Sequence, residues 1–190
     1  MSSPFGLRPP TPMQLQALLD AQAQQPLSYP DVGATQGELP AGYHTVDRSI
    51  DLGAGAEAFA RAQAGIRDWA PQHHAGIRLL PVTPPLTEGQ SLVLVFRQFP
   101  FHVSAACRVV YLVDEADRFG FGYGTLPHHP EQGEEAFMVE RDANGNVRFR
   151  IRAFSRPAHL LTKLGSPVSR AVQARVTTRY LEGLQQAVSG

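Results

Sequence analysis

Residues 134–154 read EEAFMVERDANGNVRFRIRAF, two alternating segments on either side of a turn sequence at 143–145. A three-residue loop with Gly145 in the left-handed conformation places Val139 opposite Phe149, so that apolar side chains face one another across the hairpin. A two-residue loop would instead set apolar side chains opposite arginines. The register set by the three-residue loop keeps one face of the hairpin apolar and the other charged. The stretch therefore predicts an antiparallel hairpin with one buried face.

The same alternation, interrupted by Pro, Gly, Asn or Asp turns, predicts strands over most of the middle of the chain. We expect strands at residues 43–52, 76–82, 91–99, 102–113, 117–126, 133–141 and 147–155. Helical spacing predicts a short helix at about 11–24, a second at about 55–70, and a long C-terminal helix at 157–188. Antiparallel strands followed by one long helix predict an α+β domain.

The C-terminal helix carries an apolar stripe long enough to line a sheet. Its members repeat every four residues: Leu160, Leu164, Val168, Val172, Val176, Tyr180 and Leu184. We expect a curved antiparallel sheet wrapped around this helix, with an apolar interior between them. Such an arrangement resembles the helix-grip fold of START-related and Bet v 1-like proteins, which commonly hold hydrophobic ligands.

The composition is that of one ordinary folded domain. The chain has 190 residues, 17 basic and 17 acidic side chains, and 43% apolar residues. We expect an N-terminal extension at 1–26 with a short helix, followed by a single domain at 27–188. Residues 1–10, with two prolines near the terminus, are expected to be disordered.

Several classes of protein are disfavoured by the same composition. A single cysteine, Cys107, excludes an intrachain disulfide and a cysteine-based zinc cluster. Zero net charge argues against a nucleic-acid partner. The apolar stretches are too short to form a transmembrane segment, and the proline-rich N-terminus does not match a signal peptide. We expect a cytoplasmic protein with neither a metal nor a cofactor.

One glycine pattern matches the dinucleotide-binding spacing GxGxx[GA], with Gly53, Gly55 and Ala58 at the defined positions. The preceding segment alternates polar and apolar residues, whereas a central parallel strand is almost wholly apolar. No acidic residue lies between Asp68 and Glu88, where the ribose-binding carboxylate belongs. A tight strand-to-helix turn is therefore favoured over nucleotide binding.

A second pattern places Gly120, Gly122 and Gly124 alternately with aromatic residues in one predicted strand. Glycines two residues apart in a strand share one face, which then carries no side chains. The long helix, another strand or a ligand must come close to that face. Close packing is favoured, and room for a ligand is the alternative.

Polar side chains gather at one end of the predicted sheet, near the start of the C-terminal helix. The hairpin register brings residues 133–134 beside 154–155, and the preceding loop carries two histidines. The cluster contains His128, His129, Glu134, Glu135, Ser155 and Arg156. It has the groups for general acid–base catalysis, for polar ligand contacts or for metal ligation. The favoured alternative is a loop held by a Glu134–Arg156 ion pair, with Ser155 capping the helix.

Two sets of arginines are candidates for binding. Arg148, Arg150 and Arg152 form an outward stripe, for which a solvated face is favoured and binding of an anion or a partner comes second. Arg108 shares a face with Val110. An outward arginine at a sheet edge is favoured there over a buried guanidinium that needs a carboxylate.

Several stretches together resemble the DUF1990 family, also called UPF0548. They are VGAT at 32–35, LGAG at 52–55, CRVVYLVDEADRFGFGYGTLPHHPEQGEEAF at 107–137, AFSRP at 153–157 and TRY at 178–180. The resemblance covers about 27–187 and implies a compact START-like domain, without a reaction or catalytic residues to carry over. His128 stands where a glycine is expected, so His129 is the better candidate for a shared role.

Three hypotheses for the function follow. The leading one is noncovalent binding of a small, largely apolar molecule between the sheet and the C-terminal helix. Its polar contacts would come from Arg108, Tyr123, Thr125, His129, Glu134, Ser155 and Arg156. The second is a hydrolase or isomerase that uses His129 with Glu134 or Glu135. The third is a protein- or membrane-interaction module that uses the arginine stripe.

Overall fold

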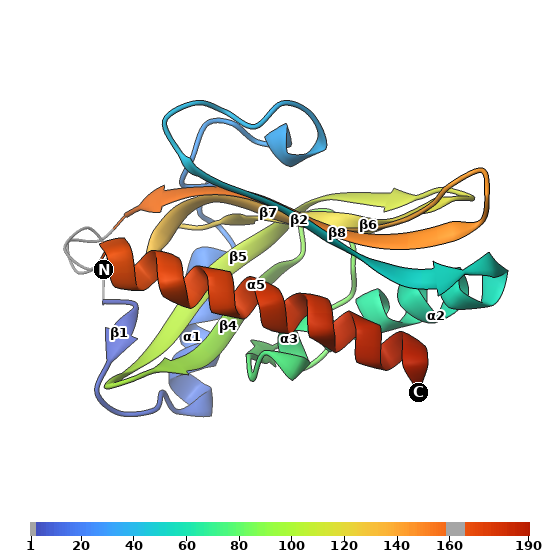
Figure 1. Cartoon of the computed structure of the whole chain (residues 1–190). Coiled ribbons are helices and arrows are strands. Elements are labelled where there is room, and N and C mark those ends of the chain that lie inside the picture. Colours follow the sequence, from blue (N-terminus) through green and yellow to red (C-terminus); the bar gives the residue numbers. More distant parts are fainter. Residues whose placement is uncertain (1–2, 159–165) are drawn as a thin grey trace.

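The structure, a computed structural model, describes residues 3–158 and 166–190 (Figure 1). Its strands are β1 (Phe5–Gly6), β2 (His44–Ala54), β3 (Arg78–Leu80), β4 (Ser91–Gln98), β5 (Phe101–Asp114), β6 (Arg118–Thr125), β7 (Glu131–Arg141) and β8 (Asn146–Pro157). Its helices are α1 (Pro12–Gln22), the 3-10 turn η1 (Ala34–Gln36), α2 (Gly55–Arg67), α3 (Ala70–His74) and α5 (Ser166–Ser189).

The strands described form one curved antiparallel sheet. Its order is β2-β8-β7-β6-β5-β4-β3, with β1 paired to β5 outside this path. Helix α5 runs along the concave face, as Figure 1 shows. The predicted α+β helix-grip fold, with a sheet curved around a long C-terminal helix, is therefore confirmed.

The β7–β8 hairpin has the register that its alternation predicts. Val139 pairs with Phe149, and Gly145 takes the left-handed conformation at φ 84°. Asp142 stabilises the turn, because its Oδ1 accepts a hydrogen bond from the Asn146 backbone N–H at 2.9 Å. Continuing this pairing along β7 fixes which side chains reach the concave face.

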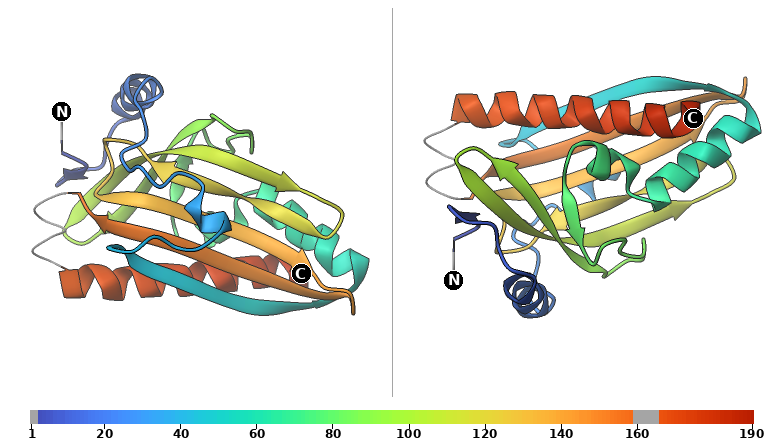
Figure 2. Two further views of the ribbon diagram at one scale, coloured as in Figure 1. Left: turned by 90° about the horizontal axis from the view of Figure 1, so that it is seen from above. Right: turned by 90° about the horizontal axis from the view of Figure 1, so that it is seen from below.

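Helices α2 and α3 pack beside the C-terminal half of α5 on the concave side of the sheet (Figure 2). Glycine allows both close approaches. A Cβ on Gly65 of α2 would lie 2.7 Å from Leu184 Cδ1, and one on Gly183 of α5 would lie 2.5 Å from His74 Cβ. Larger side chains at either position would push the helices apart.

Aromatic rings fill the interior beneath this half of α5. The Trp69 ring lies 4.8 Å from that of Phe121, and the Phe137 ring lies 5.2 Å from that of Tyr180. Trp69 is fully buried, and its Nε1 donates to the Pro84 carbonyl at 2.9 Å. Edge-to-face ring pairs add stability beyond their buried area. This part of the interior is a packed core.

The convex face is covered by the N-terminal part of the chain. Leu15 of α1 packs on Val93 and Val95 of β4. The segment 28–36, which contains η1, crosses the convex face over β6 to β8 (Figure 2, left). We call residues 28–36 the strap.

Two expectations from the sequence are wrong in detail. Residues 1–10 were expected to be disordered, but Phe5 pairs with Val103 of β5 and its ring packs 5.8 Å from that of Phe101. The C-terminal helix was expected to begin at Pro157, which instead ends β8. The positions Leu160 and Leu164 of the predicted stripe lie outside the described residues, as does the side chain of Val168.

Candidate functional site

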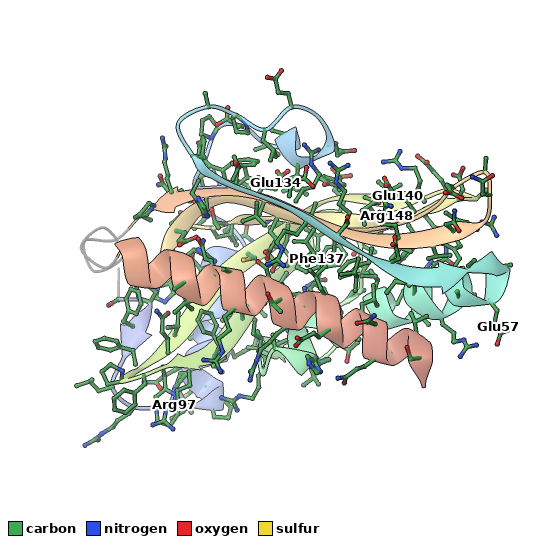
Figure 3. The ribbon with its side chains drawn as sticks, viewed as in Figure 1. Glu57, Arg97, Glu134, Phe137, Glu140 and Arg148 are labelled. Carbon is green, nitrogen blue, oxygen red and sulfur yellow. The ribbon has the colours of Figure 1, made fainter. Side chains whose placement is uncertain are left out.

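The predicted edge cluster is divided between the two faces of the sheet, because neighbouring side chains in a strand point in opposite directions. Glu134 lies on the convex side, away from α5, whereas Phe137 lies between the sheet and α5 (Figure 3). Glu135 shares the concave face with Phe137, and its neighbours across the strands are Tyr123 and Ala153. The two adjacent carboxylates therefore belong to different sites.

The concave site centres on a hydrogen bond between Tyr123 and Glu135. The Tyr123 hydroxyl donates to Glu135 Oε2 at 2.7 Å. Tyr180 of α5 interacts with both groups, and fully buried Cys107 lies close enough for its charge state to be coupled to Glu135. A carboxylate and two phenols are thus brought to one place by β6, β7 and α5.

Burial controls the ionisation of the carboxylate, the two phenols and the thiol at the concave site. It raises the pKa of Glu135 to about 7, which the hydrogen bond from Tyr123 partly opposes and the charge of Glu131 reinforces. Burial and the charge of Glu135 raise the pKa values of Tyr123 and Tyr180 well above the usual tyrosine value. Burial also raises the pKa of Cys107, so its thiol is protonated and unreactive at neutral pH.

On the β8 side, the neighbour of Glu135 on the concave face is small. Ala153 lies directly opposite, whereas Gly133, two residues earlier on β7, packs closely on β8, since a Cβ there would lie 2.8 Å from Ser155 Cα. Ser155 follows on β8, and its Oγ accepts a hydrogen bond from Gln173 Nε2 of α5 at 3.0 Å. The same nitrogen donates to Glu131 Oε2 at 2.5 Å. These contacts hold the N-terminal half of α5 over this region.

Exposure differs between the two halves of α5. Tyr180, Leu181, Leu184 and Val188 are buried, whereas Val172 and Val176 remain partly exposed. Glu135, Ala153 and Ser155 are also partly exposed, as is Phe96 on the concave face of β4. Among the described residues, aromatic rings seal the concave face beneath the C-terminal half of α5, whereas residues beneath its N-terminal half stay partly exposed.

On the convex face, Glu134 anchors the strap. Its Oε2 accepts hydrogen bonds from the Tyr29 hydroxyl and the Gly33 N–H, both at 2.7 Å. Its Oε1 accepts from the Thr35 N–H at 3.1 Å and from the Thr35 hydroxyl. Glu134 itself is buried. All its partners come from the strap, which identifies Glu134 as a structural anchor.

The glycines of β6 provide space for two tyrosines of this convex site. A Cβ on Gly124 would lie 2.7 Å from Tyr29 Cε1, and one on Gly122 would lie 2.6 Å from Tyr111 Cζ. The close packing expected at the glycine face is present, but the packed groups are tyrosines. The long helix lies on the other face.

Arg108 also serves the convex face. Its Nη2 donates to the Ala23 carbonyl at 2.8 Å, just beyond the end of α1, and its Nε donates to Ser91 Oγ at 3.1 Å. A cation at the C-terminal end of a helix is favourable. Arg108 therefore ties α1 to the sheet and points away from the concave site.

The remaining predicted contact residues have structural partners. Thr125 Oγ1 accepts from the Gly133 N–H at 3.0 Å. His129 Nδ1 accepts from the Glu131 N–H at 3.0 Å, and burial lowers the pKa of His129 to about 4. Arg156 donates to Gln132 Oε1 at 3.2 Å and lies 5.0 Å from the centre of the Tyr43 ring.

The arginine stripe on β8 is interleaved with acidic residues of β2. Arg150 Nη2 lies 2.6 Å from Asp47 Oδ2, and Arg152 Nε lies 3.3 Å from the same oxygen. Arg148 Nε lies 3.2 Å from Asp51 Oδ1. The positive charge of the stripe is therefore largely compensated within the sheet. Arg152 also lies under the strap, because its Nη1 donates to the Thr35 carbonyl at 2.6 Å.

One buried polar side chain has no partner in the described protein. Gln72 of α3 is 1% exposed, and neither its Oε1 nor its Nε2 makes a hydrogen bond there. A buried amide without partners is costly.

Among the residues that the structure describes, no three His, Cys, Asp or Glu side chains form a candidate metal site. No helix in the described parts is long and apolar enough to span a membrane.

A separate surface groove of about 810 Å³ lies between the N-terminal residues, α1 and β5. Leu15, Leu18, His102 and His128 are among the residues that line it. It is open to solvent on the convex side, and neither Glu135 nor Tyr123 reaches it. The groove is therefore distinct from the concave site.

Sequence reasoning missed several residues of the two sites. On the concave face it missed Gln173, which no periodicity marks as polar and inward-facing. Tyr180 had a signal, since it is the one hydroxyl-bearing member of an otherwise aliphatic stripe. On the convex face it missed Tyr29 and Thr35, because the placement of a loop over a sheet does not follow from hydrophobic periodicity.

The fold and the concave site define a helix-grip protein with a carboxylate–tyrosine pair under its long helix. Solved structures share this fold. A hypothetical protein from Helicobacter pylori, jhp0584, aligns with TM-score 0.56 and 12% identity over 86% of this chain and 96% of its own. The Zhui aromatase/cyclase from Streptomyces sp. R1128 aligns with TM-score 0.52 and 13% identity over 77% and 94%.

The chain belongs to the DUF1990 family. The family model described as "Domain of unknown function (DUF1990)" matches residues 28–183. A UPF0548 protein from Deinococcus radiodurans is 36% identical over 96% of this chain and 98% of its own. A UPF0548 protein from Dictyostelium discoideum is 27% identical over 97% and 95%. The family resemblance inferred from the sequence is confirmed.

Proposed function

We propose that the protein binds a small, largely apolar molecule noncovalently on the concave face, between the sheet and the N-terminal half of α5. The observation that carries this proposal is the change in exposure along α5. Tyr180 and Leu184 close the core at one end, whereas Val176 stays partly exposed at the other. Apolar surface facing a sheet stays accessible at an energetic cost, so a bound apolar molecule would stabilise it.

The chemical character of the region supports the same proposal. Apolar walls with a few convergent polar groups are typical of small-molecule sites. Phe96 and Val176 supply apolar surface, and Glu135, Tyr123 and Ser155 supply polar groups from neighbouring strands. Ala153, directly opposite Glu135, adds only a methyl group to this wall. A molecule bound here would place its polar end at the carboxylate and its apolar body under α5.

Catalysis by His129 with Glu134 or Glu135 has less support. Glu134 faces the strap on the opposite side of the sheet. His129 is held by a backbone N–H of its own loop, and its lowered pKa keeps it neutral. Two of the three groups are therefore committed elsewhere, and noncovalent binding is the better account of the geometry.

Val176→Glu is expected to weaken binding of 1-decanol at least tenfold, measured by isothermal titration calorimetry. The substitution replaces apolar surface of α5 that packs against the core with a carboxylate. Ala153→Leu, which fills the space opposite Glu135 without changing charge, is expected to weaken binding by a similar factor. Thermal unfolding of both variants checks that they remain folded.

Val82→Glu is the matched control, since Val82 is 73% exposed and lies outside the concave site. Its decanol affinity should equal that of the parent protein. Parental affinity in both folded concave-face variants would show that decanol binds elsewhere and would reject the proposed site.

A further inference from the structure

We infer that the ligand of the concave face carries a cationic amine at one end of an apolar body, and that Glu135 is its recognition residue. This inference rests on the proposed function of the concave face and adds the class of ligand. It follows from the acceptor capacity of Glu135 and from the sign of the charges around it.

Glu135 has unused acceptor capacity. A carboxylate offers about four lone-pair positions on its two oxygens. Tyr123 donates to Oε2, and no other described residue donates a hydrogen bond to Glu135. An ammonium group carries three donors and no acceptor, which complements an acceptor-only group. Charge-assisted hydrogen bonds of this kind are stronger than neutral ones.

The charges described on the concave side favour a cation over an anion. Glu131, also on β7, adds a carboxylate, and its charge acts on Glu135. Tyr123, Tyr180 and Cys107 have raised pKa values and are uncharged at neutral pH. They neither repel a cation nor attract an anion. An anionic head group would meet repulsion from the Glu135 carboxylate.

The arginines described near this region are directed elsewhere. Arg108 lies on the convex face with α1, and the arginine stripe of β8 pairs with Asp47 and Asp51. Arg48 shares the concave face of β2 but donates to Thr178 Oγ1 at 3.3 Å on the exposed flank of α5. His129 stays neutral because burial lowers its pKa. None of these groups neutralises Glu135.

The titration of Glu135 gives the inference a pH signature. Its pKa of about 7 means that the carboxylate fraction rises between pH 6 and pH 8. An alkylamine stays protonated over this range, as lysine does. Affinity for the amine should therefore rise about tenfold from pH 6 to pH 8, in proportion to the ionised fraction. An alcohol of the same length has no charge to pair and should show little change.

The test compares decylamine, 1-decanol and decanoate by isothermal titration calorimetry on the full chain at these two pH values. At the higher pH, decylamine is expected to bind at least tenfold more tightly than decanol, with decanoate weakest. Glu135→Gln keeps the size of the side chain and removes its charge. It is expected to abolish the amine preference and the pH dependence, with decanol affinity retained within about threefold.

Glu140→Gln is the matched control, because Glu140 lies on the opposite face of the same strand, 3.6 Å from Arg118. It should keep the amine preference. Decanol binding without an amine preference, or a preference that survives Glu135→Gln, would overturn this inference and leave the proposed function standing. If none of the three molecules binds, both are rejected.

Discussion

Replacing Glu134 with alanine is expected to lower the free energy of unfolding by about 3–5 kcal/mol. The substitution leaves the Tyr29 hydroxyl, the Gly33 N–H and both donors of Thr35 without their common acceptor. Each buried donor left unpaired costs about 1–3 kcal/mol, although solvent entering beneath the strap recovers part of it. Urea unfolding followed by circular dichroism measures the change.

Glu134→Gln is expected to be nearly as destabilising, because the amide NH₂ would face donors where the carboxylate had an accepting oxygen. Glu140→Ala on the same face of β7 is the control, since its partner Arg118 is partly exposed and lies 3.6 Å away. That variant should lose less than about 1 kcal/mol. Equal losses for Glu134→Ala and Glu140→Ala would contradict the role of Glu134 as the anchor of the strap.

Gly122→Ala is expected to destabilise the protein by about 2–3 kcal/mol, through overpacking. The added methyl group would lie 2.6 Å from Tyr111 Cζ. The ring cannot move aside freely, because the Tyr111 hydroxyl is hydrogen bonded to Thr35 Oγ1 at 2.7 Å beneath the strap. Denaturant unfolding gives the loss directly.

Gly37→Ala is the matched control, since a Cβ there meets no atom within 4 Å. It should change stability by less than about 0.5 kcal/mol. Combining Gly122→Ala with Tyr111→Leu should cost less than the sum of the two single changes, because the shorter side chain removes the clash. Additive losses would show that the cost does not arise from this contact.

The β-hairpin at 134–154 could be predicted in register because one face had to be apolar and the turn sequence allowed few loop lengths. The same alternation places Glu134 and Glu135 on opposite faces. The prediction that they form one cluster was based on which strand ends meet. It did not take into account the direction in which each side chain points. That error merged a structural anchor with a candidate ligand contact.

Other parts of the structure depend on contacts distant in sequence. Tyr29 reaches Glu134 across 105 positions, and no pattern within the strap indicates that partner. Gln173 reaches Ser155 from a helix whose polar positions face several directions. Sequence periodicity places residues on faces of their own element, whereas the pairing of a loop or helix with a particular strand is set by tertiary packing.

The glycine pattern of β6 shows the same limit. Three glycines on one face required a close neighbour, and the sequence indicated that requirement correctly. The neighbours of Gly122 and Gly124 are Tyr111 and Tyr29, one from the adjacent strand and one from the strap. The neighbour of Gly122 depends on a β-bulge between Val109 and Tyr111, which turns the Tyr111 ring to the convex face.

A native mass spectrum of freshly purified protein, compared with its denatured mass, shows directly whether the concave face holds a small apolar molecule. We expect an added mass that disappears on denaturation, partitions into organic solvent and is absent from Val176→Glu. If the native and denatured masses agree, and still agree after incubation with decylamine and decanol, the concave face does not bind a small apolar molecule.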